Sequence, residues 1–180
     1  MEIENDGFGE FSAVASLVNA LNDADSQNQY AFVDFGVDKI GTDAITTALI
    51  YRADKVQQVG TAAITTDAPF DYSNRAPIAQ SFKSLDTEEV FTVAVAHLKS
   101  KGGCRSATGG NADQGDGQAC WNEIRTAGAN AFADWLNSKP TGVDDEDIIL
   151  VGDMNAYAME DPIRAFADKG FKNVVAELDG

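Results

Sequence analysis

Apolar residues recur along this chain at spacings that distinguish helices from strands. Apolar positions three or four residues apart predict amphipathic helices over residues 7–22, about 121–137 and 162–169. Runs rich in β-branched residues, or alternating between apolar and polar, predict strands between and after these helices. The predicted strands cover residues 30–35, 44–51, 56–64, 78–82, 91–97, 148–151 and 171–178.

The order of these elements predicts an α/β fold. One helix comes first, several strands follow, and helices and strands then alternate. The strands 44–51 and 56–64 are joined by a short turn and have the pattern of a β-hairpin. This mixture favours a layered α/β sandwich with mixed, mostly antiparallel sheets flanked by helices over regular βαβ winding. Residues 1–180 show no linker and no internal repeat, so we expect a single domain.

The composition excludes two classes of protein and constrains a third. A hydrophobic content of 44% argues against a disordered chain. No apolar run approaches the roughly 18 residues of a membrane span. The formal net charge of −16 repels a polyanion such as nucleic acid. A chain this acidic would therefore need a divalent cation and a local set of Arg or Lys side chains to act on nucleic acid.

Two cysteines, Cys104 and Cys120, bracket a loop rich in Gly, Asp, Asn and Gln. Such a loop has little else to hold it, and a disulfide across it would stabilise the fold by about 3 kcal/mol. The pattern favours this disulfide, and with it an oxidising compartment, over two unrelated free thiols. A zinc site is disfavoured because two Cys and one His supply too few ligands at the wrong spacing.

The aliphatic run Ile148–Val151 predicts a buried strand, and it leads through Gly152 to Asp153 and Asn155. In an extended chain residues i and i+2 lie on the same face, so both polar side chains can point at one ligand. A carboxylate beside a neutral amide suits a metal-bound phosphate, since the carboxylate can bind the cation and the amide a phosphate oxygen. A strand that simply ends in an Asx turn is the alternative.

The single histidine, His97, ends another strongly apolar strand, and Lys99 follows it closely. A neutral imidazole can accept a proton from water, and a carboxylate that orients the ring keeps the required tautomer. A structural histidine is the alternative. Asp43, just before a strand, is a candidate for the orienting carboxylate, unless it is only a turn residue. Arg75 also precedes a strand, and its planar guanidinium suits either phosphate oxygens or a surface salt bridge.

Glu2 and Glu4 bracket Ile3 at the N-terminus. They either belong to a solvated chain end or are carboxylates that a strand end supplies to a metal. Because residues i and i+2 share one face of a strand, both side chains could point the same way. The choice between the two as a metal ligand therefore stays open.

Three segments, in this order, resemble motifs of the endonuclease/exonuclease/phosphatase superfamily, which includes pancreatic-type deoxyribonucleases and sphingomyelinases. They are Met1-Glu2-Ile3-Glu4-Asn5, Ala94-Val95-Ala96-His97-Leu98-Lys99-Ser100-Lys101-Gly102 and Val151-Gly152-Asp153-Met154-Asn155-Ala156. The likeness is greatest to secreted bacterial nucleases of the extracellular-nuclease type, which share the Asn-Asp-Gly-Phe-Gly opening and the Cys-bracketed loop before Trp121. The resemblance implies a DNase-like fold and a secreted protein whose signal peptide is not in this chain.

The resemblance also implies a role for each candidate residue. Glu2 would bind the divalent metal, Mg²⁺ or Mn²⁺, with Ca²⁺ as a further alternative, and Asp153 would orient or activate the attacking water. His97 would act on the scissile phosphate as an acid or an electrostatic stabiliser. The amide of Asn155 and the guanidinium of Arg75 would hold the phosphate. Together these roles describe a metal-dependent phosphodiesterase, with DNA or RNA as substrate.

Two family features do not occur in this sequence. The family has a strand before the Glu motif that supplies an Asn to the metal site, and an Asp-His motif on its last strands. We therefore expect a domain incomplete at both ends, with activity in the parent protein and self-association through the exposed sheet edges. A phosphoesterase of the same fold acting on a small or lipid phosphate, and a non-catalytic interaction domain, are the alternatives.

Overall fold

A central four-stranded sheet organises the molecule. The structure is a computed structural model that describes residues 2–72 and 74–178, so Met1, Ser73, Asp179 and Gly180 lie outside the described residues. Within the sheet β5, β6 and β7 are antiparallel neighbours, whereas β8 runs parallel to β7. In sheet order, the strands are β5 (Val56–Ile64), β6 (Ile78–Ser84), β7 (Val90–His97) and β8 (Ile148–Asp153).

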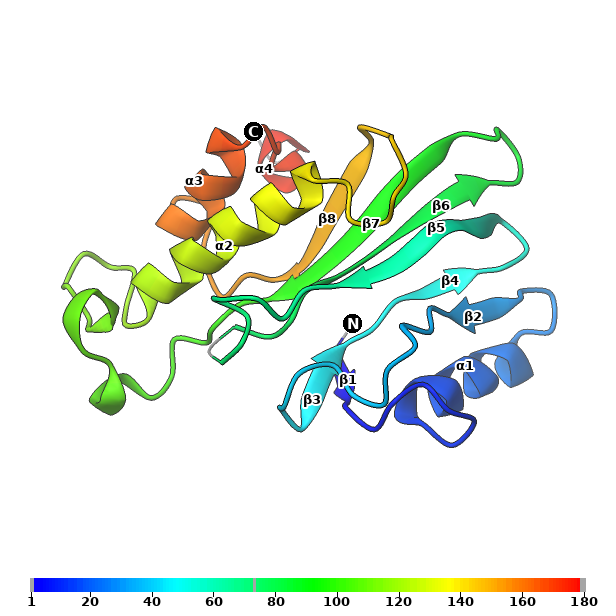
Figure 1. Cartoon of the computed structure of the whole chain (residues 1–180), viewed down its shortest axis with the longest axis horizontal. Helices are drawn as coiled ribbons and strands as arrows, with labels where there is room; N and C mark the ends of the chain where they lie inside the picture. The colour runs from blue at the N-terminus through cyan, green and yellow to red at the C-terminus, as the bar shows by residue number, and fades with distance from the viewer. Residues whose placement is uncertain (1, 73, 179–180) are drawn as a thin grey trace.

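A second β layer packs against one face of this sheet and consists of two short antiparallel pairs, β1 with β3 and β2 with β4. Helices cover the outer sides of both layers (Figure 1). The strands are β1 (Glu2–Glu4), β2 (Tyr30–Phe32), β3 (Ile45–Thr47) and β4 (Ile50–Arg52). The helices are α1 (Ala13–Ala24), α2 (Asn122–Asn137), α3 (Asp161–Asp168) and α4 (Val174–Leu178), with 3₁₀ turns at Cys104–Ser106 and Gly109–Asn111.

Alternation of side chains across β7 creates two hydrophobic cores. Ala94 and Ala96 point toward α2 and α3, and their small side chains leave room for Phe132 to pack against the sheet. Val95 points to the opposite side and packs against the second β layer. The result is the predicted layered α/β sandwich, in the order helix, sheet, sheet, helix (Figure 1).

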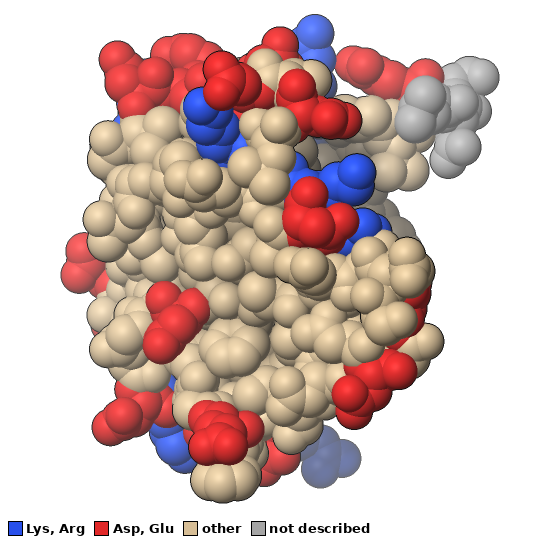
Figure 2. Space-filling view, turned by 90° about the vertical axis from the view of Figure 1, so that its right-hand side faces the viewer, with Lys and Arg blue, Asp and Glu red and all other residues tan. Residues whose placement is uncertain are grey.

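The surface of the molecule is predominantly acidic, as the net charge requires. Figure 2 views the end that carries the β4–β5 and β6–β7 turns, where carboxylates are spread over the face and basic groups are few. Within the described residues no helix is long and apolar enough to cross a membrane.

Three local predictions are wrong. The first is the hairpin between 44–51 and 56–64. The stretch 44–51 divides into β3, which pairs with β1, and β4, which pairs with β2. β5 pairs with β6 instead. The turn between β4 and β5 therefore links two layers rather than two strands of one ladder.

The second wrong prediction is the strand at 171–178. This stretch contains helix α4, whose first turn is capped by Asn173: its side-chain oxygen accepts from the backbone N–H of Ala176 at 3.2 Å. Val174 and Val175 are 60% and 70% exposed. The β-branched residues therefore meet no neighbouring strand in the described structure, and the cap decides the local conformation.

The third is burial of the aliphatic run in β8. Ile148 and Leu150 pack against the helix-side core, but Ile149 and Val151 are 51% and 44% exposed. The core under the second β layer draws its described residues on this sheet from β5, β6 and β7, so one face of β8 stays open. β8 is also the last strand of the described sheet. Self-association through this edge stays a prediction.

Candidate functional site

The ends of β7 and β8 bring two predicted site residues together. His97 and Asp153 are partners in the parallel register of these strands. His97 follows Val95 at a spacing of two residues, so its side chain shares the face that packs against the second β layer. Strand periodicity and register together place the imidazole and the carboxylate at one rim of the sandwich.

His97 lies between two carboxylates. Its Nδ1 atom is 2.7 Å from Oε2 of Glu2, and its Nε2 atom is 3.8 Å from Oδ2 of Asp153. Burial lowers the pKa of His97 below its ordinary value, and the charge of Arg75 acts in the same direction, while Glu2 and Asp153 oppose them. The ring is therefore neutral at neutral pH. Contact with Glu2 favours a proton on Nδ1, which leaves the lone pair of Nε2 facing Asp153.

Arg75 lies beside this cluster and is tied to Asp43. Its Nε and Nη2 atoms are 3.0 and 2.9 Å from Oδ2 of Asp43, and its Nη1 atom is 4.0 Å from Oε2 of Glu2. The backbone N–H of Arg75 donates to the carbonyl oxygen of His97 at 3.2 Å. Asp43, the predicted orienting partner of His97, thus contacts Arg75, and Glu2 occupies the position against the imidazole.

A buried amide, Asn5, holds the loop that carries Asp43. Asn5 as a whole residue is 3% exposed. Its Nδ2 atom donates to the carbonyl oxygens of Ile40 and Asp43, both at 2.9 Å, and its Oδ1 atom accepts from the N–H of Ile40 at 3.1 Å. Sequence reasoning assigned no role to Asn5, because its partners lie on a loop far away along the chain.

Asn155 forms an Asx turn and also braces the rim of the sheet. Its backbone N–H donates to Oδ1 of Asp153 at 2.8 Å, and its Nδ2 atom donates to the carbonyl oxygen of Leu98 at 3.0 Å. Its φ of 47° lies in the left-handed region, which Asn tolerates better than most residues. The turn aligns Asp153 so that its second oxygen faces His97. The Asx-turn interpretation is therefore confirmed, and contact of the Asn155 amide with a phosphate stays a prediction.

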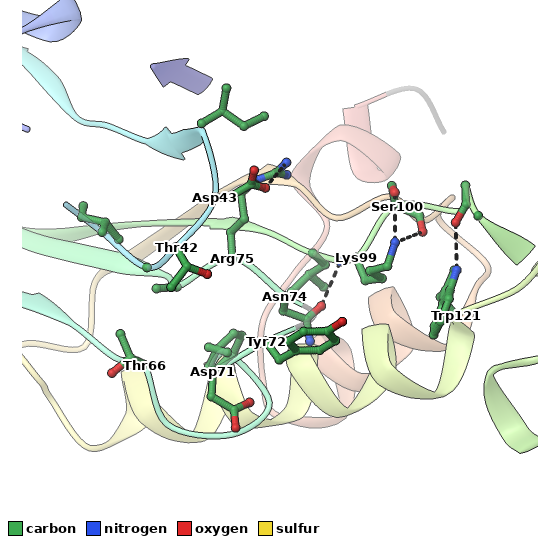
Figure 3. Close-up of a pocket in the computed structure, with 18 of the residues that line it drawn as sticks. Thr42, Asp43, Thr66, Asp71, Tyr72, Asn74, Arg75, Lys99, Ser100 and Trp121 are labelled. Carbon is green, nitrogen blue, oxygen red and sulfur yellow. Dashed lines mark hydrogen bonds and ion pairs between the residues drawn. The ribbon is translucent and has the colours of Figure 1, made fainter. Parts of the chain in front are cut away.

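A cleft of about 720 Å³ runs alongside the cluster (Figure 3). Its walls include Asp43 and Arg75 but not His97. The other walls come from the segments after β5 and β7 and from the start of α2. Its prominent polar and aromatic lining residues are Asp43, Tyr72, Asn74, Arg75, Lys99 and Trp121.

Asn74, a second residue without a predicted role, joins these walls. It is 3% exposed, and its Nδ2 atom donates to the carbonyl oxygens of Pro69 and Ile124. Its Oδ1 atom accepts from the backbone N–H of Lys99 at 2.8 Å. A Cβ on Gly128 would lie 2.7 Å from the Asn74 amide nitrogen, so α2 can approach only because this residue is glycine. In the sequence, the position of Asn74 directly before Arg75 is the signal that could have pointed to this role.

The predicted disulfide between Cys104 and Cys120 is confirmed, with Cα atoms 5.5 Å apart. The loop it closes is held more firmly than its composition suggests. Arg125 is fully buried and donates from Nη1 to the carbonyl oxygen of Cys120 and from Nη2 to that of Gln118, both at 2.8 Å. The Gln118 side chain also donates to Asp161 at 2.9 Å. The loop therefore forms a fixed wall beside the cleft.

The Glu2 carboxylate at the rim is the candidate ligand for a metal ion. Among the described residues, no group of three or more His, Cys, Asp or Glu side chains is arranged to hold a metal ion. Glu2 uses Oε2 toward His97, and within the described part of the chain its Oε1 atom has no partner. Mg²⁺ commonly binds through one or two carboxylates, with water and substrate phosphate completing its octahedron. The Glu2 carboxylate fits such a largely hydrated ion.

Solved structures of similar fold include a member of the endonuclease/exonuclease/phosphatase family. The human Nocturnin catalytic domain, solved with bound sulfate, matches with a TM-score of 0.57 and 20% identity over 89% of this chain. An endonuclease/exonuclease/phosphatase family protein from Bacteroides thetaiotaomicron matches with a TM-score of 0.54 and 20% identity over 86%. A mannosyl-6-phosphatase from the same organism matches with a TM-score of 0.51 and 19% identity over 87% of this chain. The chain thus has the endonuclease/exonuclease/phosphatase, or DNase-like, fold.

The similarity ends at the level of fold. The chain spans about half the length of these three structures, which it covers by 53%, 50% and 54%. No protein-family model matches the sequence, and no curated protein matches it.

Proposed function

We propose that the full-length protein is a metal-dependent phosphodiesterase. The observation that carries this proposal is the position of His97 between Glu2 and Asp153, with the guanidinium of Arg75 alongside. Carboxylates suited to a hard cation, a neutral imidazole and an Arg fork are the groups that hydrolysis of a phosphate ester uses. They come from separate segments of the chain and meet at one rim.

Each residue has a role that its contacts support. Glu2 would hold a divalent cation such as Mg²⁺ or Mn²⁺, which would supply positive charge to the phosphate oxygens. Arg75 binds the same phosphate, and its ion pair with Asp43 holds the guanidinium in place. Asp153 orients the attacking water. His97 takes the proton of that water at Nε2, and the carboxylate of Glu2 at Nδ1 stabilises the imidazolium that forms.

We further propose that the substrate is nucleic acid and that the protein works outside the cell. The motif likeness to secreted bacterial nucleases supports both points, and the disulfide supports an oxidising compartment. The acidic surface is compatible with this substrate because the cation and Arg75 supply positive charge where it is needed.

Cleavage of plasmid DNA and of RNA by the full-length protein tests the proposal. We expect hydrolysis with Mg²⁺ or Mn²⁺, none with EDTA, and a loss of about a thousandfold in kcat for His97→Ala and for Asp153→Ala. Asp23→Ala, which removes an exposed carboxylate from α1, serves as the matched control and retains activity. Failure to cleave either nucleic acid with any divalent metal contradicts the nuclease assignment.

A small phosphate ester is the second candidate substrate. The cleft volume of about 720 Å³ lies within the range of pockets that bury small molecules. Chromogenic phosphate mono- and diesters separate the candidates: rapid hydrolysis of a monoester, with intact plasmid, favours the small substrate. An absence of hydrolysis of every ester would indicate a non-catalytic domain.

A further inference from the structure

The cleft beside His97 contains residues that the proposed chemistry does not use. We propose that Lys99 and Tyr72 form a nucleotide subsite, in which Lys99 contacts a phosphate next to the scissile one and Tyr72 stacks on the adjoining base. This inference rests on the proposed function and extends it, because it makes the substrate a polynucleotide rather than an isolated phosphate ester. Figure 3 shows Lys99 between Arg75 and Trp121, with Tyr72 in the same cleft.

Lys99 is a cation without a counter-ion. Its ammonium lies 5.0 Å above the ring centroid of Trp121 and donates to the backbone and side-chain oxygens of Ser100, both at 3.3 Å. In the described part of the chain no carboxylate lies within 4.0 Å of it. The contrast with Lys101 is direct, since that ammonium is 2.5 Å from Oε1 of Glu160.

The surroundings of Lys99 favour binding of an anion. Partial burial lowers the pKa of its ammonium, and the neighbouring charges of Arg125 and Arg75 add to the effect. A cation that has lost part of its hydration, next to other cations, gains stability when a phosphate oxygen approaches. Lys99 also lies two residues after His97, so an anion bound to it is close to the proposed reaction site.

Trp121 fixes the position of this ammonium. The indole N–H donates to the carbonyl oxygen of Gly102 at 2.8 Å, and the backbone N–H donates to that of Asn111 at 2.7 Å. The preceding residue, Cys120, is held by the disulfide. The ring is therefore a fixed platform, and its π face keeps the Lys99 head group at the cleft wall.

Tyr72 offers an open aromatic surface in the same cleft. It is 92% exposed, yet it lies between Phe70 and Asn74, which are 5% and 3% exposed. Phe70 and Asn74, two positions away on either side, are thus packed into the protein, while Tyr72 is exposed to solvent. An exposed aromatic ring beside a cationic group is the arrangement with which proteins bind single-stranded nucleic acid, by stacking on a base while a cation meets the backbone.

The overall charge makes these positions selective. The chain has 29 acidic and 13 basic residues, so most of its surface repels a polyanion. Arg75 and Lys99 line one cleft, together with the carboxylates of Asp43, which pairs with Arg75, and of Asp71. A nucleic acid strand can approach along this path, where two successive phosphates would each meet a cation.

Binding of a fluorescein-labelled single-stranded oligothymidine to the full-length protein, followed by anisotropy in EDTA, tests the subsite without cleavage. We expect Lys99→Ala and Tyr72→Ala each to weaken binding about tenfold. Lys99→Ala should also lower the slope of log K against log salt by about 0.7, whereas Tyr72→Ala leaves that slope unchanged. Tyr72→Phe, which keeps the ring, should bind as wild type does.

Matched controls are Lys55→Ala, an exposed lysine in the β4–β5 turn, and Phe11→Ala, an aromatic residue that is 90% exposed before α1. Both should leave affinity unchanged. If Lys99→Ala and Tyr72→Ala bind as wild type does, or no more weakly than the controls, the subsite is wrong. Circular dichroism melting confirms that each variant is folded.

Hydrolysis of bis(p-nitrophenyl) phosphate separates this inference from the proposed function, since that diester has no neighbouring nucleotide. Wild type and the control variants Lys55→Ala and Phe11→Ala should hydrolyse it, and His97→Ala should not. Normal hydrolysis with unchanged oligonucleotide affinity overturns the subsite alone. No hydrolysis by the wild type overturns the proposed function, whatever the binding result.

Discussion

A Cβ atom placed on Gly152 would lie 1.9 Å from the carbonyl oxygen of Ala96. The two residues are register partners in β8 and β7, and each is followed by a residue of the candidate site, Asp153 and His97. Gly152 has a φ of 138°, which L-residues with a side chain rarely adopt. The strands therefore approach at this point only because a side chain is missing, and that approach sets the spacing of imidazole and carboxylate.

Replacing Gly152 by alanine should destabilise the fold by about 3 kcal/mol or more, because the clash adds to the strain of the backbone. Urea unfolding measures the change. Gly142→Ala is the matched control: its φ of 74° is also positive, but a Cβ there meets nothing within 4 Å. The control should cost about 1 kcal/mol, the strain alone. Equal losses in the two variants would show that the close approach is not needed.

The titration of His97 should reveal its neighbours directly. It is the only histidine, so its ring protons give a single set of NMR signals. In metal-free buffer its pKa should lie below the ordinary value of 6.5, mainly because of burial. Glu2→Gln should lower the pKa further, and Arg75→Gln should raise it, since the first removes a negative charge and the second a positive one. Shifts of the opposite sign would contradict the described contacts.

The same shift makes stability depend on pH. Because the pKa of His97 is lower in the folded state, the unfolded chain binds more protons between the folded pKa and 6.5. The free energy of unfolding should thus rise with pH through that window, and the penalty should be fully present only below the folded pKa. His97→Gln removes this term. The stability of wild type relative to His97→Gln should therefore fall on acidification below 6.5, and stay level above it.

Asn5→Ala should show that the Asp43 loop depends on a buried amide. The change leaves the carbonyl oxygens of Ile40 and Asp43 and the N–H of Ile40 without the side-chain partner described above. We expect a loss of about 2–3 kcal/mol in urea unfolding. Asn28→Ala, which removes only an exposed contact with Asp25, should cost less than about 0.5 kcal/mol. Similar losses at the two positions would argue against a supporting role for Asn5.

Loss of the disulfide should destabilise the protein by about 3 kcal/mol, the chain-entropy value for a loop of this length. The double variant Cys104→Ala/Cys120→Ala measures it by thermal or urea unfolding. Dithiothreitol should lower the stability of wild type toward that of the variant and have no effect on the variant itself. A much smaller loss would mean that Arg125 and Asp161 hold the loop unaided.

Local pattern was sufficient for most elements and insufficient for their partners. The nearly continuous apolar run of β7 reflects burial on both faces, and the apolar spacing of α2 reflects burial on one face; each segment records this in its own residues. The division of 44–51 between two partner strands is not recorded in this way, because residues 45–47 and 50–52 both have strand-like sequences and nothing local shows that they pair with different strands. The exposed side of β8 could not be predicted either. Ile149 lies in an aliphatic run typical of a buried strand, but the second β layer does not extend over it, so its side chain is exposed.

The sequence by itself identified the candidate site residues and the strand ends on which they lie. His97, Asp153 and Arg75 were predicted from their positions beside strands, because the period of two residues assigns each side chain to a face. Tertiary structure alone decided their contacts: Glu2 lies against His97, Asp43 against Arg75, and Lys99 on Trp121. These neighbours are brought together by the packing of whole layers, whose long-range pairings no local period encodes.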